Sequence, residues 1–235
     1  MIETFLISWN ESDTIHLTIK HYLKFGKVTL FDNFSNDGTP EIADKLGAYV
    51  QSFGRKGVLD DKEYLKIKNN CWKESKADYV IVCDSDEILQ IDNKLIEREL
   101  SKGVTIFKTW GWNIFSNKMP KKDWAEINTG FHDPNFSKQI IFSPKLRGIN
   151  YVYGCHVCNP EGDLKYSNTV LPLFHYRNVG GVDRLIQRHK SYRRRMSDLN
   201  KRLRLGYHYL TEEKKKRKEW HDCFQNSIEF SQDFI

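Results

Sequence analysis

The sequence predicts an α/β protein with a mostly parallel central sheet, flanking helices and a helical C-terminal extension. Short apolar runs alternate with segments of helical periodicity through the first hundred residues. Each apolar run has the length of a strand, and each intervening segment has the length of a crossover helix. The chain has 235 residues, of which 39% are hydrophobic, so it is long enough to bury the core of one domain.

The first strand is predicted at residues 4–8, whose apolar run suits a buried parallel strand. A helix follows, for which Ser12 or Asp13 is the expected N-cap and Gly26 the expected end. A second strand over residues 28–31 leads into a turn. There we expect Thr39 to cap a helix and Pro40 to occupy its first position.

This second helix should stop at Gly47, and a third strand should begin at residue 48. A helix over residues 60–75 and a strand over residues 78–83 continue the alternation.

Beyond about residue 103 the pattern changes, because aromatic residues become dense and Gly and Pro interrupt the chain. Short strands are predicted at 138–143 and 169–176, and helices at 181–204 and 211–230. We therefore divide the chain into residues 1–103, 104–180 and 181–235.

Several features bear on the cellular compartment and on the state of the cysteines. The longest apolar runs have only a strand's length, and the first residues lack the pattern of a secretion signal, so we expect a cytoplasmic protein. Five cysteines, an odd number, are expected to be reduced thiols. The segment Cys155-His156-Val157-Cys158 resembles half of a zinc site, but no second pair of ligands answers it.

Polar side chains follow three of the predicted strands directly. The clusters are Asn10-Glu11, Asp32-Asn33 and Asp84-Ser85-Asp86-Glu87. Because the carboxyl ends of parallel strands meet at one edge of a sheet, these clusters should converge on a single site.

Asp84 and Asp86 are the main chemical evidence. Two carboxylates two residues apart, just after a buried strand, can share a divalent cation, and oxygen ligands suit Mg²⁺ or Mn²⁺. Such a cation can offset the charge on a departing diphosphate. Taken alone, the tetrapeptide is equally consistent with an acidic turn.

The order of these motifs resembles the family 2 glycosyltransferases. In that family the chain has, in order, a strand followed by Asn-Glu, a strand followed by Asp-x-Ser-x-Asp-Gly-Thr, an Arg-Asn pair and a strand followed by Asp-x-Asp. The matching segments here are Asn10-Glu11, the run from Asp32 to Thr39, Lys68-Asn69 and the run from Asp84 to Glu87. Weaker similarity continues past residue 137, through Phe174-His175-Tyr176.

The resemblance implies a GT-A fold and an inverting, metal-dependent transfer of a sugar from a nucleotide-sugar donor to a glycan or other hydroxyl acceptor. By analogy the nucleotide is uridine diphosphate and the product part of a polysaccharide. Residues 1–103 would form the donor-binding half and residues 104–180 the acceptor side, followed by the basic helices of residues 181–235.

The resemblance also implies roles for single residues. The base and ribose would lie against Asn10, Glu11 and Asp32, and Lys68 would approach the diphosphate or the sugar. Asp84 would meet the ribose or sugar and also the Mn²⁺ or Mg²⁺ ion, with Asp86 as the main metal ligand. The remaining donor-binding residues would be Ser8, Asn69 and Ser85.

Two positions stay open. For the third metal ligand we favour His156 over His175, because its neighbours Gly154 and Cys155 suggest a tight loop near the site. For the catalytic base the candidates are Asp133, Glu161 and Asp163, each of which also fits an ordinary loop residue.

The aromatic residues between 107 and 124 fit either an acceptor platform or core packing.

The net charge of +6 lies wholly in residues 181–235, which carry 14 Lys and Arg against 8 Asp and Glu. These charges fit solvated helix faces, or attraction to a phosphate-bearing partner such as an anionic membrane surface, at which the protein would be peripheral. No recognised nucleic-acid motif is present, so no specific nucleic acid is expected.

Two other functions compete with sugar transfer. A nucleotidyltransferase shares the sheet and the acidic metal site, but needs a Gly-rich basic loop after the first strand. Here that loop is Trp9-Asn10-Glu11-Ser12-Asp13, which has neither glycine nor a basic residue. A non-catalytic module that binds polyanions or membranes through the basic helices is the other alternative.

Overall fold

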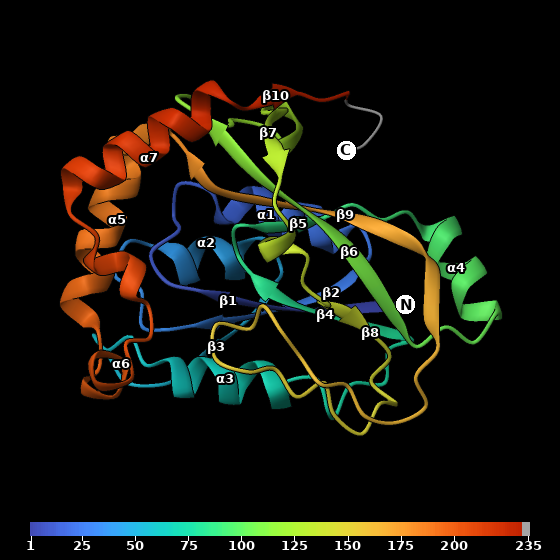
Figure 1. The fold of residues 1–235 in the computed structure, drawn as a ribbon. Coiled ribbons are helices and arrows are strands. Elements are labelled where there is room, and N and C mark those ends of the chain that lie inside the picture. The colour runs from blue at the N-terminus through green and yellow to red at the C-terminus, as the bar shows by residue number, and fades with distance from the viewer. Residues whose placement is uncertain (232–235) are drawn as a thin grey trace.

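The structure, a computed structural model, describes residues 1–231 and confirms the α/β class. In the first hundred residues strands and helices alternate as predicted (Figure 1). These elements are β1 (Ile2–Ser8), α1 (Ile15–Leu23), β2 (Gly26–Asp32), α2 (Thr39–Lys45), β3 (Tyr49–Ser52), α3 (Asp61–Asn70), β4 (Tyr79–Asp84), β5 (Glu87–Leu89) and α4 (Asn93–Ser101).

The second part adds long strands and the helical extension. Its strands and 3₁₀ turns are β6 (Ile106–Ser116), η1 (Trp124–Glu126), β7 (Thr129–His132), η2 (Pro134–Phe136), β8 (Ile141–Phe142) and β9 (Tyr166–Val179). The C-terminal elements are α5 (Gly181–Arg195), α6 (Asp198–Leu203), η3 (Tyr207–Leu210), α7 (Glu213–Gln225) and β10 (Ile228–Glu229).

All the strands belong to one sheet. Strands β3, β2, β1 and β4 are parallel neighbours in that order, with Ser8 opposite Asp32 and Ile7 opposite Asp84. Beyond β4 the sheet becomes mixed, since β8 pairs antiparallel with β4 and with β6, while β6 and β9 pair in parallel. The register brings the carboxyl ends of β1, β2 and β4 to one edge.

Side-chain alternation explains why the parallel strands are buried on both faces. On β4, Tyr79, Ile81 and Cys83 pack in the cluster that includes α1 and α2. The intervening Val80 and Val82 pack in a second cluster with Trp72 and, at its margin, α3. Helices therefore cover both faces, which a parallel sheet requires.

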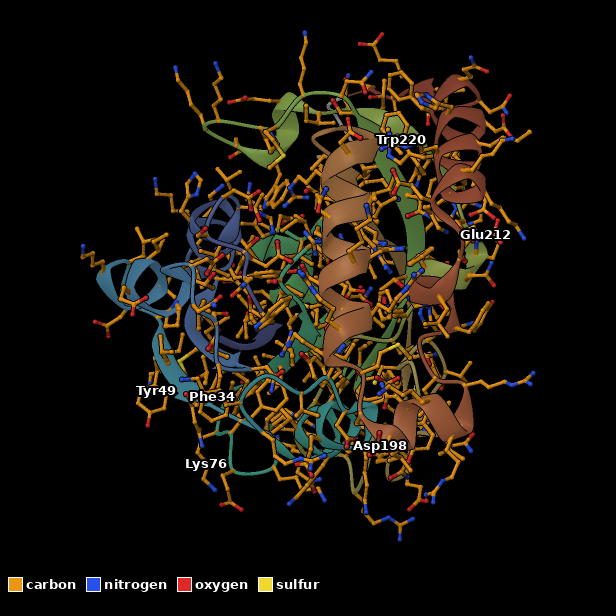
Figure 2. All side chains as sticks on the ribbon, turned by 90° about the vertical axis from the view of Figure 1, so that its left-hand side faces the viewer. Phe34, Tyr49, Lys76, Asp198, Glu212 and Trp220 are labelled. Atoms are coloured by element: carbon orange, nitrogen blue, oxygen red, sulfur yellow. The ribbon has the colours of Figure 1, made fainter. Side chains whose placement is uncertain are left out.

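The C-terminal helices cover the edge at which the parallel strands end. In Figure 1, α5, α6 and α7 lie at the left of the sheet, opposite α4 and the N-terminus. Seen from that side, α5 stands upright in the middle of the view, with α7 at its right (Figure 2). This extension forms the second wall of the cleft described below. Among the described helices, none is long and apolar enough to cross a membrane.

Several predicted boundaries were wrong at the caps. Helix α1 has Thr14, not Ser12 or Asp13, at its N-cap, and Gly26 begins β2. Gly38, in a left-handed conformation, takes the cap position predicted for Thr39. A cap is a local choice among neighbouring polar residues, and the tertiary contacts of Glu11 and Asp13 decide it here.

The helix predicted over residues 181–204 is in fact two helices. Leu59 N–H donates to Arg195 O (2.7 Å), and Ser197 N–H donates to Leu59 O (2.9 Å). The chain leaves the helix at Met196 to make this bridge, and Ser197 then caps α6. The helix predicted over 211–230 ends at Gln225, and residues 228–229 pair with β7 instead.

Gly111 on β6 supports one side of the cleft through close backbone approach. A Cβ on this residue would lie 2.3 Å from Phe136 C and 2.5 Å from Phe136 O. The turn η2 can therefore rest directly on the strand, where Asp133 N–H donates to Gly111 O (2.9 Å).

We expect Gly111→Ala to lower the free energy of unfolding by about 2 kcal/mol or more, because η2 must move away from β6. Gly57→Ala is the control, since Gly57 has open space around it and φ +74°. It should cost only the roughly 1 kcal/mol of a left-handed alanine. Urea unfolding measures both, and equal losses would contradict this role of Gly111.

Candidate active site

A cleft of about 710 Å³ lies at the carboxyl ends of β1 and β4, facing the C-terminal helices. Seven of the residues predicted from the sequence line it: Ser8, Glu11, Lys68, Asp84, Ser85, Asp86 and His156. The donor and metal residues were predicted to converge on this edge, and the structure brings these seven together.

Asp84 ends β4 and forms an ion pair with a buried lysine. Its Oδ1 lies 2.7 Å from Lys68 Nζ on α3, and its Oδ2 lies 3.9 Å from Lys138 Nζ. Burial alone would lower the pKa of Lys68, but the Asp84 carboxylate outweighs it and raises that pKa. Lys68 is therefore a fixed positive charge in the floor of the cleft.

Glu87, which the resemblance did not assign a role, anchors the acidic turn. Its carboxylate accepts the backbone N–H of Asp84 (3.0 Å) and pairs with Lys138, and both side chains are buried. Burial favours the neutral acid, but the Lys138 and Lys68 charges prevail and lower the pKa of Glu87 to about 2. Glu87 thus holds the turn in shape as a permanent anion.

Asp86 faces an imidazole and a guanidinium. Its Oδ1 lies 3.6 Å from His175 Nε2 and its Oδ2 lies 3.5 Å from Arg188 Nη2. Although burial opposes ionisation, His175 and Arg188 hold the pKa of Asp86 well below its usual range. The Asp86 carboxylate is consequently ionised over the whole working range of pH.

Glu11 is the second carboxylate bound to Arg188. Arg188 Nη1 donates to Glu11 Oε2 (2.9 Å), and Nη2 donates to Oε1, so the pair is bidentate. Burial, reinforced by Asp86, raises the pKa of Glu11 to about 7 against the opposing effect of Arg188. Two buried carboxylates share one guanidinium, and Glu11 is the one that keeps its proton to higher pH.

The metal-binding prediction can be tested against this donor set. Within residues 1–231, no three His, Cys, Asp or Glu side chains are grouped as a ready metal site. Asp86 and His175 are nevertheless neighbours, and Mg²⁺-type ions use one or two carboxylates together with substrate phosphates and water. The residues therefore fit a cation that arrives with a diphosphate.

His175, rather than the favoured His156, lies beside Asp86. The antiparallel pairing of β5 with β9 sets Glu87 opposite His175 and brings the imidazole to Asp86. His156 lines the same cleft, but its Nδ1 contacts the backbone O of Asn135 (2.5 Å). The Cys158 thiol of the suspected half zinc site donates to Gln139 Oε1 (2.7 Å).

Three predicted donor residues support the cleft from behind instead of lining it. Asp32 is buried and accepts the N–H (2.8 Å) and hydroxyl (2.5 Å) of Ser35. Asn10 has a left-handed φ of 53° and bonds to Asn36. Asn69 exchanges two hydrogen bonds with the backbone of Tyr151 and so holds the loop that carries His156.

The candidate bases do not line the cleft. Asp133 caps η2, where it accepts from Asn135 N–H (3.0 Å), and its other oxygen accepts from Asn113 Nδ2 (3.0 Å). Glu161 is exposed in a loop whose backbone pairs with Gly148, and Asp163 is exposed in the same loop.

Lys138, Arg177 and Arg188 are the functional candidates that sequence reasoning missed. Lys138 and Arg177 stand alone in the sequence and give no signal. Arg184, Arg188 and Arg195 recur at helical spacing, and all three point to the strand ends, where they meet Asp13, Glu11 and the Asn33 side chain. This stripe was a detectable sign that one face of the basic helix is buried.

Several charges of the basic region form ion pairs with acidic residues of the same region. Beside the stripe on α5, Lys190 pairs with Glu213 (2.8 Å), Arg217 with Asp183 (2.7 Å) and Lys218 with Asp222 (2.6 Å). These exposed pairs agree with the interpretation as solvated helix faces. The membrane-facing alternative stays a prediction.

Searches of protein-family models and of curated proteins found no match. Comparison with solved structures found partial similarities. One is mannosyl-3-phosphoglycerate synthase from Rubrobacter xylanophilus, with 19% identity and a TM-score of 0.35 over 47% of this chain and 40% of that one. Another is S. aureus TarS, with 14% identity and a TM-score of 0.40 over 51% and 23%.

A third is glucosyl-3-phosphoglycerate synthase from Mycobacterium tuberculosis, in complex with Mn²⁺, uridine diphosphate and glucosyl-3-phosphoglycerate. It has 22% identity and a TM-score of 0.33 over 47% of this chain and 44% of that one. Each similarity thus spans about half of this chain and less than half of the other protein. The function is therefore argued below from the cleft itself.

Removing Arg188 should be costly, because it leaves two buried carboxylates without their counter-charge. We expect Arg188→Met to lower the free energy of unfolding by about 3 kcal/mol at pH 7.5, measured by urea titration. In the double variant with Glu11→Gln, part of this loss should return. Lys190→Met, on the same helix and paired with the exposed Glu213, should cost at most about 1 kcal/mol. Equal losses for Arg188→Met and Lys190→Met would contradict the assignment.

The raised pKa of Glu11 gives a pH signature. A carboxyl whose folded pKa of about 7 exceeds its unfolded value binds its proton more tightly when folded, so stability should increase as pH falls through 7. Relative to Glu11→Gln, the wild type should gain about 1.4 kcal/mol between pH 8 and pH 6 in metal-free buffer. Glu161→Gln, at an exposed position, is the control. Parallel pH profiles for wild type and Glu11→Gln would refute the assignment.

Proposed function

We propose that this protein is a glycosyltransferase that moves a sugar from a nucleoside diphosphate sugar to a hydroxyl acceptor. One observation carries the proposal: carboxylates able to hold a divalent cation and buried cations able to hold phosphates alternate in one cleft at the carboxyl ends of parallel strands. Asp84 and Asp86 are the carboxylates, and Lys68, Lys138 and Arg188 are the cations. A metal–diphosphate group needs both kinds of side chain.

Asp86 and His175 would hold the Mn²⁺ or Mg²⁺ ion, with Asp84 as the second carboxylate. The ion would supply positive charge to offset the charge on the departing diphosphate. Lys68 and Lys138, fixed by their ion pairs, would supply further positive charge to the same group.

The nucleoside end of the donor would occupy the part of the cleft next to β1. Ser8, Trp9 and Tyr64 line it there, and Ser85 lies beside Ser8. The guanidinium of Arg195 lies 3.5 Å over the ring of Trp9 and fixes the position of this ring. Asp32, Asn10 and Asn69 would act by holding these walls in place, not by touching the nucleotide.

In the transfer, an acceptor hydroxyl oxygen forms a bond to the anomeric carbon, and the bond from that carbon to the diphosphate breaks. The hydroxyl proton passes to a base, and the nucleoside diphosphate leaves with the electron pair. Direct displacement of this kind inverts the anomeric centre. Since Asp133 and Glu161 do not line the cleft, the proposal gives neither of them the part of the base.

The donor nucleotide is proposed as uridine diphosphate and the product as part of a polysaccharide or related glycan. Mn²⁺ and uridine diphosphate accompany one of the partially similar structures, and this pair is the natural first probe. The first loop, Trp9 to Asp13, has none of the glycines that a nucleotidyltransferase needs to receive a triphosphate.

The proposal predicts that uridine diphosphate with Mn²⁺ raises the thermal midpoint of the protein, whereas either alone has little effect. Asp86→Asn should abolish the metal-dependent part of the shift and lower transfer from a UDP-sugar by about a hundredfold or more. The matched control is Asp44→Asn, an exposed carboxylate on α2. No shift with uridine, guanosine or thymidine diphosphate, each with Mn²⁺, would rule the proposed function out.

A further inference from the structure

A second, smaller cavity of about 300 Å³ adjoins the main cleft. Its walls come from β6, η2, β9, α5, η3, α7 and the loop that carries His156. It shares five residues with the main cleft: Phe136, His156, His175, Arg177 and His208. Trp220, labelled on α7 in Figure 2, forms part of its apolar wall. Nothing in the proposed donor site uses this space.

Arg177 brings an unpaired positive charge to this cavity. Its Nη2 contacts His189 Nε2 (2.8 Å), and its guanidinium lies 5.4 Å from the centre of the Tyr209 ring. Within residues 1–231, no carboxylate lies within 4 Å of it, and its side chain makes no other hydrogen bond. A guanidinium has five N–H donors, so most of those on Arg177 are free for a ligand.

Two buried imidazoles lie beside this guanidinium. Because the Arg177 N–H donates to His189 Nε2, His189 is neutral with its proton on Nδ1. His208 Nε2 is buried and has no hydrogen-bond partner in the described part of the chain. Burial, reinforced by Arg177, lowers the pKa of His189 to about 2 and that of His208 to about 3. Both imidazoles therefore act as neutral hydrogen-bonding groups at pH 7.

Lys216 on α7 adds a second cation, paired with Glu219 at 2.7 Å. Among the Arg, Lys and Glu side chains that line the cavity, Arg177 and Lys216 exceed the single carboxylate, so these side chains carry a net positive charge, although the Asp86 carboxylate of the main cleft also acts on Arg177. A phosphate monoester matches it, since it brings up to two negative charges and three acceptor oxygens for the free donors. A carboxylate would bring only one charge and two oxygens.

We propose that this cavity binds the phosphate group of a phosphate monoester, with Arg177 as the main anchor and Lys216 and His208 as further contacts. That this phosphate monoester is the acceptor of the sugar rests on the proposed transferase function. The wall shared by the two cavities would set the sugar or alcohol portion of the monoester next to Asp86 and His175. The binding of a phosphate group in this cavity does not depend on the transferase function.

The direct test is titration of the full chain with inorganic phosphate by calorimetry or ³¹P NMR, without nucleotide or metal. We expect binding to weaken about tenfold or more in Arg177→Gln, which loses a charge-assisted hydrogen bond. Lys216→Met should weaken it severalfold, and it remains informative if Arg177→Gln does not fold. The matched control is Lys215→Met, an exposed neighbour on the same helix, which should bind as the wild type does.

Two further arms identify the source of the phosphate. Glucose 6-phosphate in solution should compete with phosphate if the ligand is a soluble monoester. Vesicles containing phosphatidic acid should compete, again through Arg177, if it is borne on a lipid.

Several outcomes would overturn the anion site. Phosphate binding that Arg177→Gln and Lys216→Met leave unchanged is one, and the absence of any phosphate binding is another. Simple competition between phosphate and metal-free uridine diphosphate for a single site would assign Arg177 to the donor and also refute it. Arg177-dependent phosphate binding in a protein that binds no nucleoside diphosphate would instead keep the anion site and refute the transferase.

Discussion

The ion pair between Arg188 and Glu11, extended to Asp86, is the interaction on which the geometry of the cleft depends. It joins the loop after β1, the turn after β4 and the middle of α5, which are separated by up to 177 residues in sequence. Without it, the sheet edge would present buried carboxylates to one another, and the middle of α5 would lose its polar contact with the strand ends. A buried charge without its partner is costly, so this contact couples the stability of the sheet edge to the position of α5.

This arrangement also bears on how a divalent cation would enter. Arg188 forms an ion pair with Asp86, and Lys68 forms one with Asp84, so each carboxylate already has a counter-charge. A bare metal ion must compete with these internal cations. A metal–diphosphate unit would not face the same opposition, because its phosphate oxygens would offer Arg188 and Lys68 new partners. The ion and the nucleotide should therefore bind cooperatively, and the internal ion pairs would be the source of that cooperativity.

Much of the donor half could be predicted from the sequence, since it follows from local rules: apolar runs of strand length, helices between them, and polar residues at the strand ends. These rules placed Glu11, Asp84 and Asp86 at one edge, and the resemblance added Lys68. They did not separate residues that line the cleft from those that hold its walls, such as Asp32, whose carboxylate turns back to its own loop. That distinction depends on side-chain direction, which spacing along the chain does not determine.

The other side of the cleft was harder to predict because it is assembled from contacts distant in sequence. His175 reaches Asp86 only through the pairing of β5 with β9, and no local sequence pattern predicts this pairing. A run of arginines on a helix is ambiguous in sequence, since a solvated face and a face buried against carboxylates have the same composition. The spacing of Arg184, Arg188 and Arg195 indicates a buried face only when carboxylates are known to lie opposite these three side chains. Those carboxylates, Asp13 and Glu11, lie in the loop after β1. The sheet edge and the basic extension therefore have to be interpreted as one electrostatic unit.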